Sequence, residues 1–154
     1  MWRGTVVSIH TTPAAGQPME TLPEARALAG RGLEGDRYAA GVGFYSPHPS
    51  EGGREVTLIE TETLEALAAA GLKLGAADTR RNIATSGAPL NHLVGRDFQV
   101  GEVRMRGTRL CEPCRRLEGM TQTGVMAALI HRGGLRARIL NDGVIRVGDA
   151  ITLT

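Results

Sequence analysis

The stretch LRARILNDGVIRVGDAITL, residues 135–153, carries the clearest signal of fold class in the chain. Strand-like runs at residues 135–140, 144–147 and 151–153 follow one another closely, and Asn141-Asp142-Gly143 has the composition of a hairpin turn. In the first run, apolar residues alternate with arginines, which is typical of a strand with one buried face. The stretch therefore predicts a β-meander.

The meander extends toward the N-terminus. Residues 98–100 and 103–107 read as strands joined by a turn at Val100-Gly101-Glu102, and a helix over residues 124–131 interrupts the series before Gly133-Gly134. Residues 2–10 also read as a strand, so the first and last strands can pair and remove the exposed edges of the sheet. We predict a mainly β fold, a distorted closed β-barrel with two or three short helices.

The remaining elements are shorter and separated by glycines. Residues 35–53 contain several glycines and prolines, and we expect a long loop there, of a kind that is often functional. The other expected elements are a short helix over residues 23–29, a strand over 54–59, a helix over 61–70 with Gly71 as its cap, a strand over 82–85 and a helical turn over 90–94.

Composition limits the class of protein. The length of 154 residues suits one domain, taken as residues 1–154, and 42% hydrophobic residues are enough for a real core. Aromatic residues make up only 3% and the net charge is only +2, which argues against nucleic-acid binding. No apolar run approaches the roughly 20 residues of a membrane span, and the first residues lack the features of a signal peptide. We therefore expect a cytoplasmic protein that binds neither membrane nor nucleic acid.

The segment LCEPCRRLE, residues 110–118, holds both cysteines of the chain in a C-x-x-C spacing. A structural zinc site takes four cysteine or histidine ligands, and no second pair is present in the sequence. A thioredoxin-like redox site lies at the start of a helix in a β-α-β setting, whereas this segment follows a strand of a meander. Both of these uses are disfavoured.

Two further interpretations of the cysteines stay open. Arg115 and Arg116 follow Cys114 directly, and nearby cations lower the pKa of a thiol, although Glu112 opposes them. The resulting thiolate could bind a soft metal or carry a persulfide, with Cys111 as a resolving partner. Alternatively, both cysteines are inert side chains at the end of a strand, because free cysteine is among the most buried residue types.

Four stretches in a fixed order resemble the MOSC domain. This module forms the C-terminal end of eukaryotic molybdenum-cofactor sulfurases and also occurs in stand-alone bacterial proteins. The resemblance implies a distorted β-barrel similar to the pyruvate kinase barrel, in agreement with the meander. The stretches are GLEGDRYAAG (residues 32–41), RRNIATSGAPLNHLVG (80–95), LCEPCRRLE (110–118) and RGGLRARILNDGVIRVGD (132–149).

The resemblance also implies a molybdenum–molybdopterin cofactor. It carries Cys114 over as the catalytic residue, acting as metal ligand or sulfur carrier, and Arg80 and Asn82 as contacts to the phosphate and edge of the pterin. Arginine binds phosphate through two parallel hydrogen bonds, which suits this role. Arg115, beside the thiol, and Arg136 are candidates to extend the anion site.

Each of these arginines also has an ordinary structural interpretation. Arg80-Arg81 could be a solvated charge pair before a strand, because arginine is the default cation of this chain. Arg136 could belong to the polar face of a half-buried strand. Similarly, Asp36 and Arg37 could orient a ligand or brace their loop.

Three functions follow from this reading. The first is a molybdenum-cofactor-binding module, with reduction of N-hydroxylated compounds as an activity that the resemblance implies. The second is a non-catalytic sulfur shuttle that works with a PLP-dependent cysteine desulfurase or a molybdoenzyme. Nothing suggests that this chain binds PLP itself, because its one lysine, Lys73, lies in an ordinary G-L-K-L-G turn. The third is a barrel with inert cysteines. Glu112 is a departure from the family pattern, since a carboxylate beside an anionic cofactor is unfavourable unless it points away.

Overall fold

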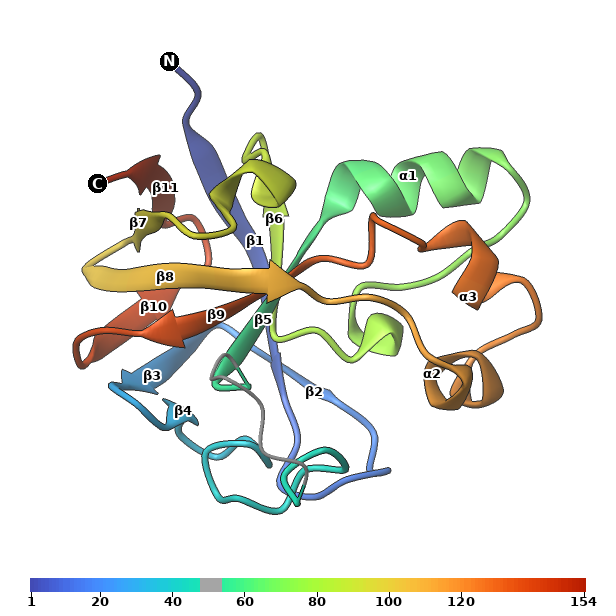
Figure 1. The fold of residues 1–154 in the computed structure, drawn as a ribbon, viewed down its shortest axis with the longest axis horizontal. Helices are drawn as coiled ribbons and strands as arrows, with labels where there is room; N and C mark the ends of the chain where they lie inside the picture. Colours follow the sequence, from blue (N-terminus) through green and yellow to red (C-terminus); the bar gives the residue numbers. More distant parts are fainter. Residues whose placement is uncertain (48–53) are drawn as a thin grey trace.

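A closed barrel of seven strands dominates the computed structural model, which describes residues 1–47 and 54–154 (Figure 1). The strands are hydrogen-bonded in the order β11-β7-β8-β9-β5-β6-β1, and β1 pairs with β11 to close the circle. The predicted barrel and the predicted pairing of its first and last strands are confirmed. The strands are β1 (Gly4–Thr11), β5 (Val56–Glu60), β6 (Ile83–Ser86), β7 (Asp97–Val100), β8 (Val103–Leu110), β9 (Leu135–Ile139) and β11 (Ala150–Leu153).

One strand pair makes the barrel a mixed sheet. β5 and β6 are parallel, whereas the other neighbours in the barrel are antiparallel. A parallel pair requires a long crossover connection, and here helix α1 (Thr61–Ala69) provides it. The predicted helix over residues 61–70 is confirmed, and Gly71, with φ +92°, follows its C-cap Ala70 as expected.

The meander prediction is wrong at one turn. Residues 141–143 do not join a hairpin, because β10 (Gly143–Arg146) leaves the barrel and pairs with β3 (Glu24–Leu28) in a separate small sheet that also contains β4 (Gly32–Leu33). The turn side chains cap neighbouring segments instead: Asp142 Oδ1 accepts from the Ala29 N–H, and Asn141 Oδ1 accepts from the Arg104 N–H.

The predicted short helix over residues 23–29 is also wrong. This segment is strand β3, in which Ala25 and Ala27 are buried while Glu24 and Arg26 are exposed. The burial period is therefore two residues, as in a strand. Alanine has the highest helix propensity, but propensity is a weak determinant, and pairing with β10 and β4 on both sides overrides it.

The described helices gather at one end of the barrel (Figure 1). Besides α1 they are α2 (Arg115–Met120) and α3 (Val125–Ala128); the helix expected over residues 124–131 is thus shorter than predicted, and α2 was not predicted. The helical turn expected over residues 90–94 is confirmed as a 3₁₀ turn, η2 (Leu90–Leu93), and a second one is η1 (Ala77–Thr79).

Strand β2 (Glu20–Leu22) extends the main sheet beside β1. Among the described residues, no helix is long and apolar enough to cross a membrane.

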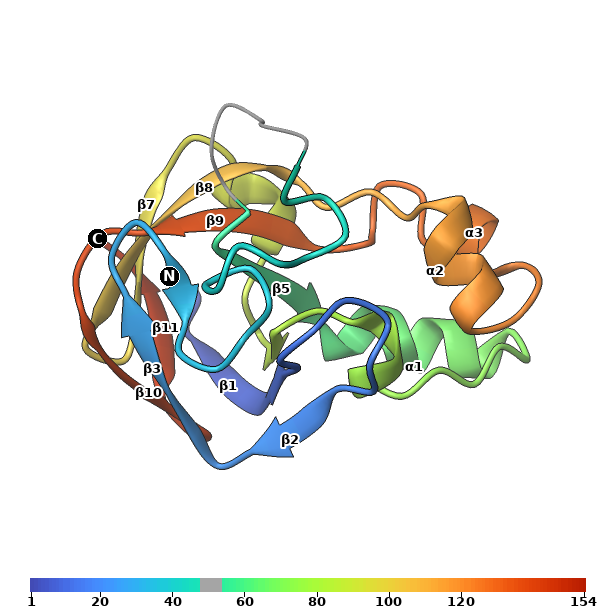
Figure 2. The same ribbon diagram turned by 90° about the horizontal axis from the view of Figure 1, so that it is seen from below.

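Two apolar clusters hold the fold together. The larger cluster fills the barrel and includes Phe98, Met105 and Ile145, each fully buried. The smaller cluster joins the helices through Leu67 of α1, Leu117 of α2 and residues of α3. Burial of a large apolar side chain contributes about 1.5–3 kcal/mol. The smaller cluster therefore fixes α2, and with it the cysteine segment, at the end of the barrel where the helices gather (Figure 2).

The long loop expected over residues 35–53 is confirmed as far as residue 47. Residues 48–53, the remainder of that expected loop, lie outside the described residues.

Candidate functional site

An arginine-lined cleft lies where the barrel meets α2. Its empty space, counted out to the solvent, is about 630 Å³. Three of the five aromatic residues of the chain line it, namely Tyr38, Phe44 and Tyr45, together with both cysteines. No carboxylate lines it within residues 1–47 and 54–154. The lining arginines are Arg37, Arg54, Arg80, Arg81, Arg116 and Arg136.

Cys114 stands at the N-cap of α2 and is half-buried in this cleft. Burial raises the pKa of its thiol, but the Tyr45 hydroxyl, which is hydrogen-bonded to the sulfur, lowers it, as do the backbone N–H groups at Leu117 and Arg116 and the charge of Arg81. The net pKa of Cys114 is below its ordinary value, so the thiolate fraction at neutral pH is increased.

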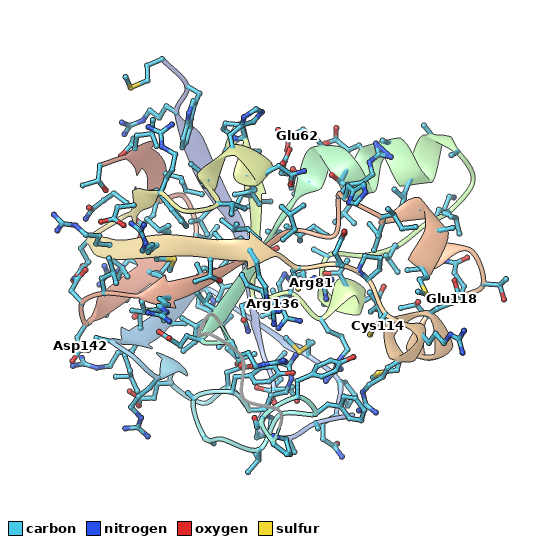
Figure 3. All side chains as sticks on the ribbon, viewed as in Figure 1. Glu62, Arg81, Cys114, Glu118, Arg136 and Asp142 are labelled. Carbon is cyan, nitrogen blue, oxygen red and sulfur yellow. The ribbon has the colours of Figure 1, made fainter. Side chains whose placement is uncertain are left out.

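Arg81 fixes the backbone around the cysteines. Its side chain is buried and donates from Nε to the Gly133 carbonyl at 2.8 Å, from Nη2 to the Cys111 carbonyl at 2.9 Å, and from Nη1 to the Thr79 carbonyl at 3.3 Å. Figure 3 places Arg81, Arg136 and Cys114 in one region between the barrel and α2. The interpretation of Arg80-Arg81 as a solvated pair is therefore wrong for Arg81. No sequence signal distinguished it from the other arginines of the chain.

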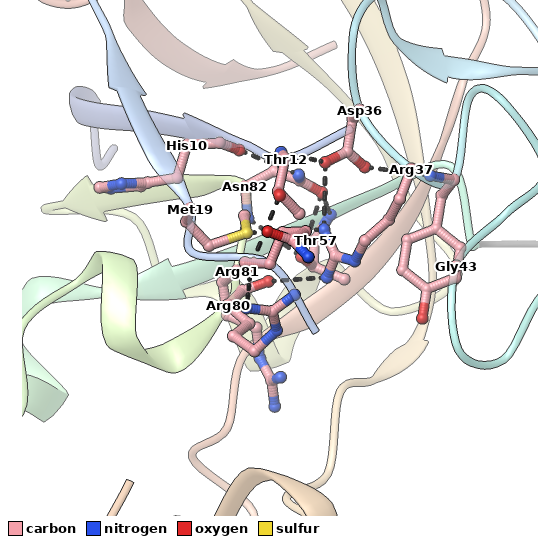
Figure 4. Close-up of polar contacts among 12 residues, drawn as sticks. His10, Thr12, Met19, Asp36, Arg37, Gly43, Thr57, Arg80, Arg81 and Asn82 are labelled. Atoms are coloured by element: carbon pink, nitrogen blue, oxygen red, sulfur yellow. Dashed lines mark hydrogen bonds and ion pairs between the residues drawn. The ribbon is translucent and has the colours of Figure 1, made fainter. Parts of the chain in front are cut away.

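Of the two residues predicted to contact the pterin, Arg80 lines the cleft and Asn82 does not. Burial lowers the pKa of Arg80, and the charges of Arg37 and Arg116 lower it further. The Asn82 side chain is buried and already bonded: Oδ1 accepts from the N–H and hydroxyl of Thr57, and Nδ2 donates to the His10 carbonyl (Figure 4). Asn82, which directly precedes β6, therefore links β5 to β1. Its side chain does not line the cleft.

The two remaining predicted arginines differ in position. Arg136 of β9 reaches the cleft, and its buried Nε has no hydrogen-bond partner among the described residues. Arg115 is exposed and does not line the cleft; the next residue, Arg116, does so, and its guanidinium lies 4.0 Å from the centre of the Phe44 ring. Side chains of consecutive helical residues point about 100° apart. Helix α2, which the sequence did not predict, therefore determines that Arg116 and not Arg115 lines the cleft.

Glu112 points away from the cleft. Its carboxylate accepts hydrogen bonds from the backbone N–H of His131 at 2.7 Å and pairs with the His131 ring at 2.8 Å. This pairing removes the conflict between a carboxylate in the C-x-x-C segment and an anionic ligand beside Cys114.

Asp36 braces its loop rather than facing the cleft. It is fully buried and accepts from the Thr12 N–H, the Tyr38 N–H and the Arg37 guanidinium, the last at 3.0 Å (Figure 4). Arg37, held in this way, lines the cleft and donates from Nη2 to the Arg80 carbonyl. The interpretation that Asp36 braces its loop is therefore correct. Arg37 is bonded to Asp36 and also lines the cleft.

The arrangement suits an anion held next to a thiol whose pKa is lowered. Like charges in a partly buried site repel one another, and a bound anion relieves that repulsion. Within the described part of the chain, no three histidine, cysteine, aspartate or glutamate side chains gather as a metal site.

Comparisons with known proteins agree with this architecture. The model of the MOSC domain family matches residues 23–152. A search of curated proteins found no match. The structure of YuaD from Bacillus subtilis is similar with a TM-score of 0.80 and 17% sequence identity, covering 98% of this chain and 97% of that one.

Two structures of YiiM are also similar. The protein from Geobacillus stearothermophilus has a TM-score of 0.73 at 15% identity, covering 98% of this chain and 75% of that one. The protein from Escherichia coli has a TM-score of 0.66 at 18% identity, covering 100% of this chain and 70% of that one. At these identities the likeness shows the fold alone. The family match spans most of the sequence, however, and the chain therefore belongs to the MOSC domain family.

Proposed function

We propose that the cleft binds a molybdenum cofactor of the molybdopterin type, with Cys114 as its metal ligand or as a carrier of persulfide sulfur. The observation that carries this proposal is the composition of the cleft: six arginines surround a pKa-lowered thiol, and no carboxylate lines the described part of it. Family membership supports the same assignment, because the MOSC family is associated with this cofactor.

The residues present fit a phosphorylated, planar ligand. The buried Nε of Arg136, which has no hydrogen-bond partner among the described residues, is a donor available to a phosphate oxygen. Arg80 also lines the cleft and would add a second cation for the same anionic group. Tyr38 and Phe44 add aromatic walls to the cleft, and the guanidinium groups of Arg37 and Arg116 lie over these rings at 4.7 and 4.0 Å.

The chain's own groups would prepare Cys114 for its role. Arg81 holds the Cys111 carbonyl and so sets where the C-x-x-C backbone lies. The Tyr45 hydroxyl, hydrogen-bonded to the sulfur, holds a proton next to it and favours the thiolate. When bound, the cofactor would supply two-electron redox chemistry at molybdenum. Reduction of an N-hydroxylated compound is the activity to assay.

Co-purification tests the proposal. The protein is expressed in cells that make the cofactor, and its molybdenum and pterin are quantified by elemental analysis and by fluorescence of the oxidised pterin. We expect both in the wild type, loss of molybdenum in Cys114→Ser, and loss of pterin in Arg136→Gln. Arg115→Gln is the matched control, because it removes an exposed arginine outside the cleft. Wild-type protein without molybdenum or pterin would overturn the proposal.

Sulfur transfer is a second candidate function, favoured by the presence of both cysteines in one cleft. A thiolate at Cys114 can accept a sulfur atom from the persulfide of a cysteine desulfurase, and a molybdoenzyme would then be the acceptor. Incubation with a desulfurase and cysteine should add about 32 Da to Cys114, the mass of one sulfur atom. Absence of this adduct in a protein that carries molybdenum would leave metal ligation as the role of Cys114.

A further inference from the structure

Arginines gather on the outer face of β8 and β9, which lie side by side in the barrel wall (Figure 1). In both strands the arginines alternate with buried residues, so they point away from the barrel interior. Neither strand contains a carboxylate. We call this set the arginine ribbon, and its members are Arg104, Arg106 and Arg109 of β8 and Arg136 and Arg138 of β9.

The strand register places like charges opposite each other in this ribbon. Arg106 lies directly opposite Arg138, and beyond a β-bulge Arg109 lies opposite Arg136. Side chains in such positions share one face of the sheet with Cβ atoms about 4.5–5.5 Å apart, and like charges there are destabilising. Asp97 of β7 offsets part of the repulsion, since it pairs with Arg106 at 2.8 Å. The ribbon therefore contains a repulsion that a bound anion relieves.

The arginine ribbon continues into the arginine-lined cleft. Arg136 belongs to both. Burial lowers the pKa of Arg54, another residue of the cleft wall, and the charges of Arg136 and Arg109 lower it further. In addition, β8 ends at Leu110, where the cysteine segment begins. A partner bound along the ribbon would therefore lie beside the mouth of the cleft.

The spacing and composition of the ribbon favour an acidic protein segment over a nucleic acid. Alternate residues of a strand are about 6.6–6.8 Å apart, so Arg104 and Arg106 match carboxylates at alternate positions of an extended peptide. Neither strand carries an aromatic residue on which a base could stack. The net charge of +2 is also too small to attract a nucleic acid over a distance.

We propose that the arginine ribbon docks an extended acidic segment of a partner protein, with carboxylates at alternate positions, beside the mouth of the cleft. The carboxylates pair with the arginines of β8, and relief of the repulsion between β8 and β9 adds to the affinity. The proposed function uses only Arg136 of this ribbon. Docking therefore needs neither molybdenum nor pterin.

Fluorescence anisotropy of the full chain with two labelled peptides tests the docking. One peptide has glutamates at alternate positions separated by threonines, and the other has the same composition with its glutamates in one run. At low salt the alternating peptide should bind at least about threefold more tightly, because only its carboxylates match the strand spacing. Its dissociation constant should rise at least about tenfold between roughly 20 and 200 mM salt, since exposed charges are screened.

A double variant tests the position of the surface. Arg104→Gln with Arg109→Gln should weaken the alternating peptide at least about tenfold, and both side chains are exposed. Arg3→Gln with Arg115→Gln is the matched control, because it removes two exposed arginines elsewhere; it should change the affinity less than about twofold. The ribbon variant should unfold at the same or a higher temperature than the wild type, since part of the like-charge repulsion is removed.

Each contrary outcome overturns a definite part of this inference. Equal affinity for the two peptides overturns the match to an extended segment, and equal weakening in the two double variants overturns the location on the ribbon. A single-stranded oligonucleotide that binds more tightly than the alternating peptide, and is lost in the ribbon variant, would make this face a nucleic-acid surface instead. Peptide binding by a protein that never carries molybdenum supports the docking surface while the proposed function fails, and a molybdenum-loaded protein that ignores both peptides has the opposite meaning.

Discussion

The barrel interior and the arginine-lined cleft lie next to each other but are built from opposite kinds of side chain. The interior is aliphatic apart from Phe98, and its residues are almost completely removed from water. The cleft collects six arginines, and burial together with neighbouring charges lowers the pKa of both Arg54 and Arg80. Burial of the apolar interior stabilises the folded state, whereas burial of the cleft arginines reduces their hydration and disfavours their charged form.

This difference indicates where stability and binding reside. Side chains in the barrel should matter for folding and little for ligand affinity, while the outermost cleft arginines should matter for affinity and little for folding. Arg81 lies between these extremes, since it lines the cleft but is buried and bonded to backbone. Four substitutions, ordered by their expected effect on stability, test the contrast.

Phe98→Ala should cause the largest loss of stability. The side chain is fully buried in the barrel, and removing a buried phenyl ring typically costs about 3–5 kcal/mol of unfolding free energy. Urea denaturation measures the loss. Val7→Ala is the control, because Val7 is 42% exposed on β1 and should cost less than about 1 kcal/mol. Equal losses for the two variants would contradict the assignment of stability to the interior.

Arg81→Met should cost an intermediate amount. The substitution leaves the carbonyls of Thr79, Cys111 and Gly133 without their donor, and an unsatisfied buried polar group costs about 1–3 kcal/mol. It should also slow alkylation of Cys114 at neutral pH, since the charge of Arg81 lowers the pKa of that thiol. Arg115→Met, in the exposed position, should change neither quantity. A fully stable Arg81→Met variant would show that these hydrogen bonds contribute nothing.

Tyr45→Phe should change reactivity more than stability. The Tyr45 hydroxyl is one of the groups that lower the pKa of Cys114, so its removal raises that pKa. The rate of iodoacetamide alkylation, followed against pH in a Cys111→Ser background, should then reach its midpoint at a higher pH than in the parent. An unchanged midpoint would mean that the hydroxyl does not act on the thiolate in solution.

Arg136→Gln should have the smallest effect on stability, within about 0.5 kcal/mol and in either direction. The variant loses a partly buried charge, and with it the repulsion that lowers the pKa of Arg54. Its affinity for inorganic phosphate, measured by titration calorimetry, should nevertheless fall, whereas Arg138→Gln on the exposed part of the same strand should leave it unchanged. A large loss of stability in Arg136→Gln would place this arginine with the barrel rather than with the cleft.

Much of the barrel could be predicted because its signals are local. Alternation in β9, the Gly101-Glu102 turn between β7 and β8, and the glycine after α1 are each encoded within a few residues. The errors occurred where distant partners decide the structure. β3 has helix-favouring alanines but pairs with β10, and the turn before β10 sends it to β3 instead of back along β9.

The candidate site shows the same division. Cys114, Arg80 and Arg136 lie in one cleft, as the motifs suggested, but Arg115 and Asn82 do not line it. The sequence did not predict α2 because the helix has only six residues, follows Pro113 closely and contains Gly119. Without that helix, Arg115 and Arg116 are equivalent candidates. Asn82 was expected to face a ligand, yet its amide is fully used between strands.

By itself, the sequence determined where the seven barrel strands lie, that the first and last of them could close a barrel, and that Cys114 lies in a basic segment. These properties depend on periodicity, turn residues and composition, which neighbouring residues carry. Only the tertiary structure decided which arginines face the cleft, that Arg81 holds the cysteine backbone, and that Glu112 turns toward His131. Side-chain direction and hydrogen-bond partners depend on segments far apart in the chain, and these meet only when the barrel closes and the helices pack against it.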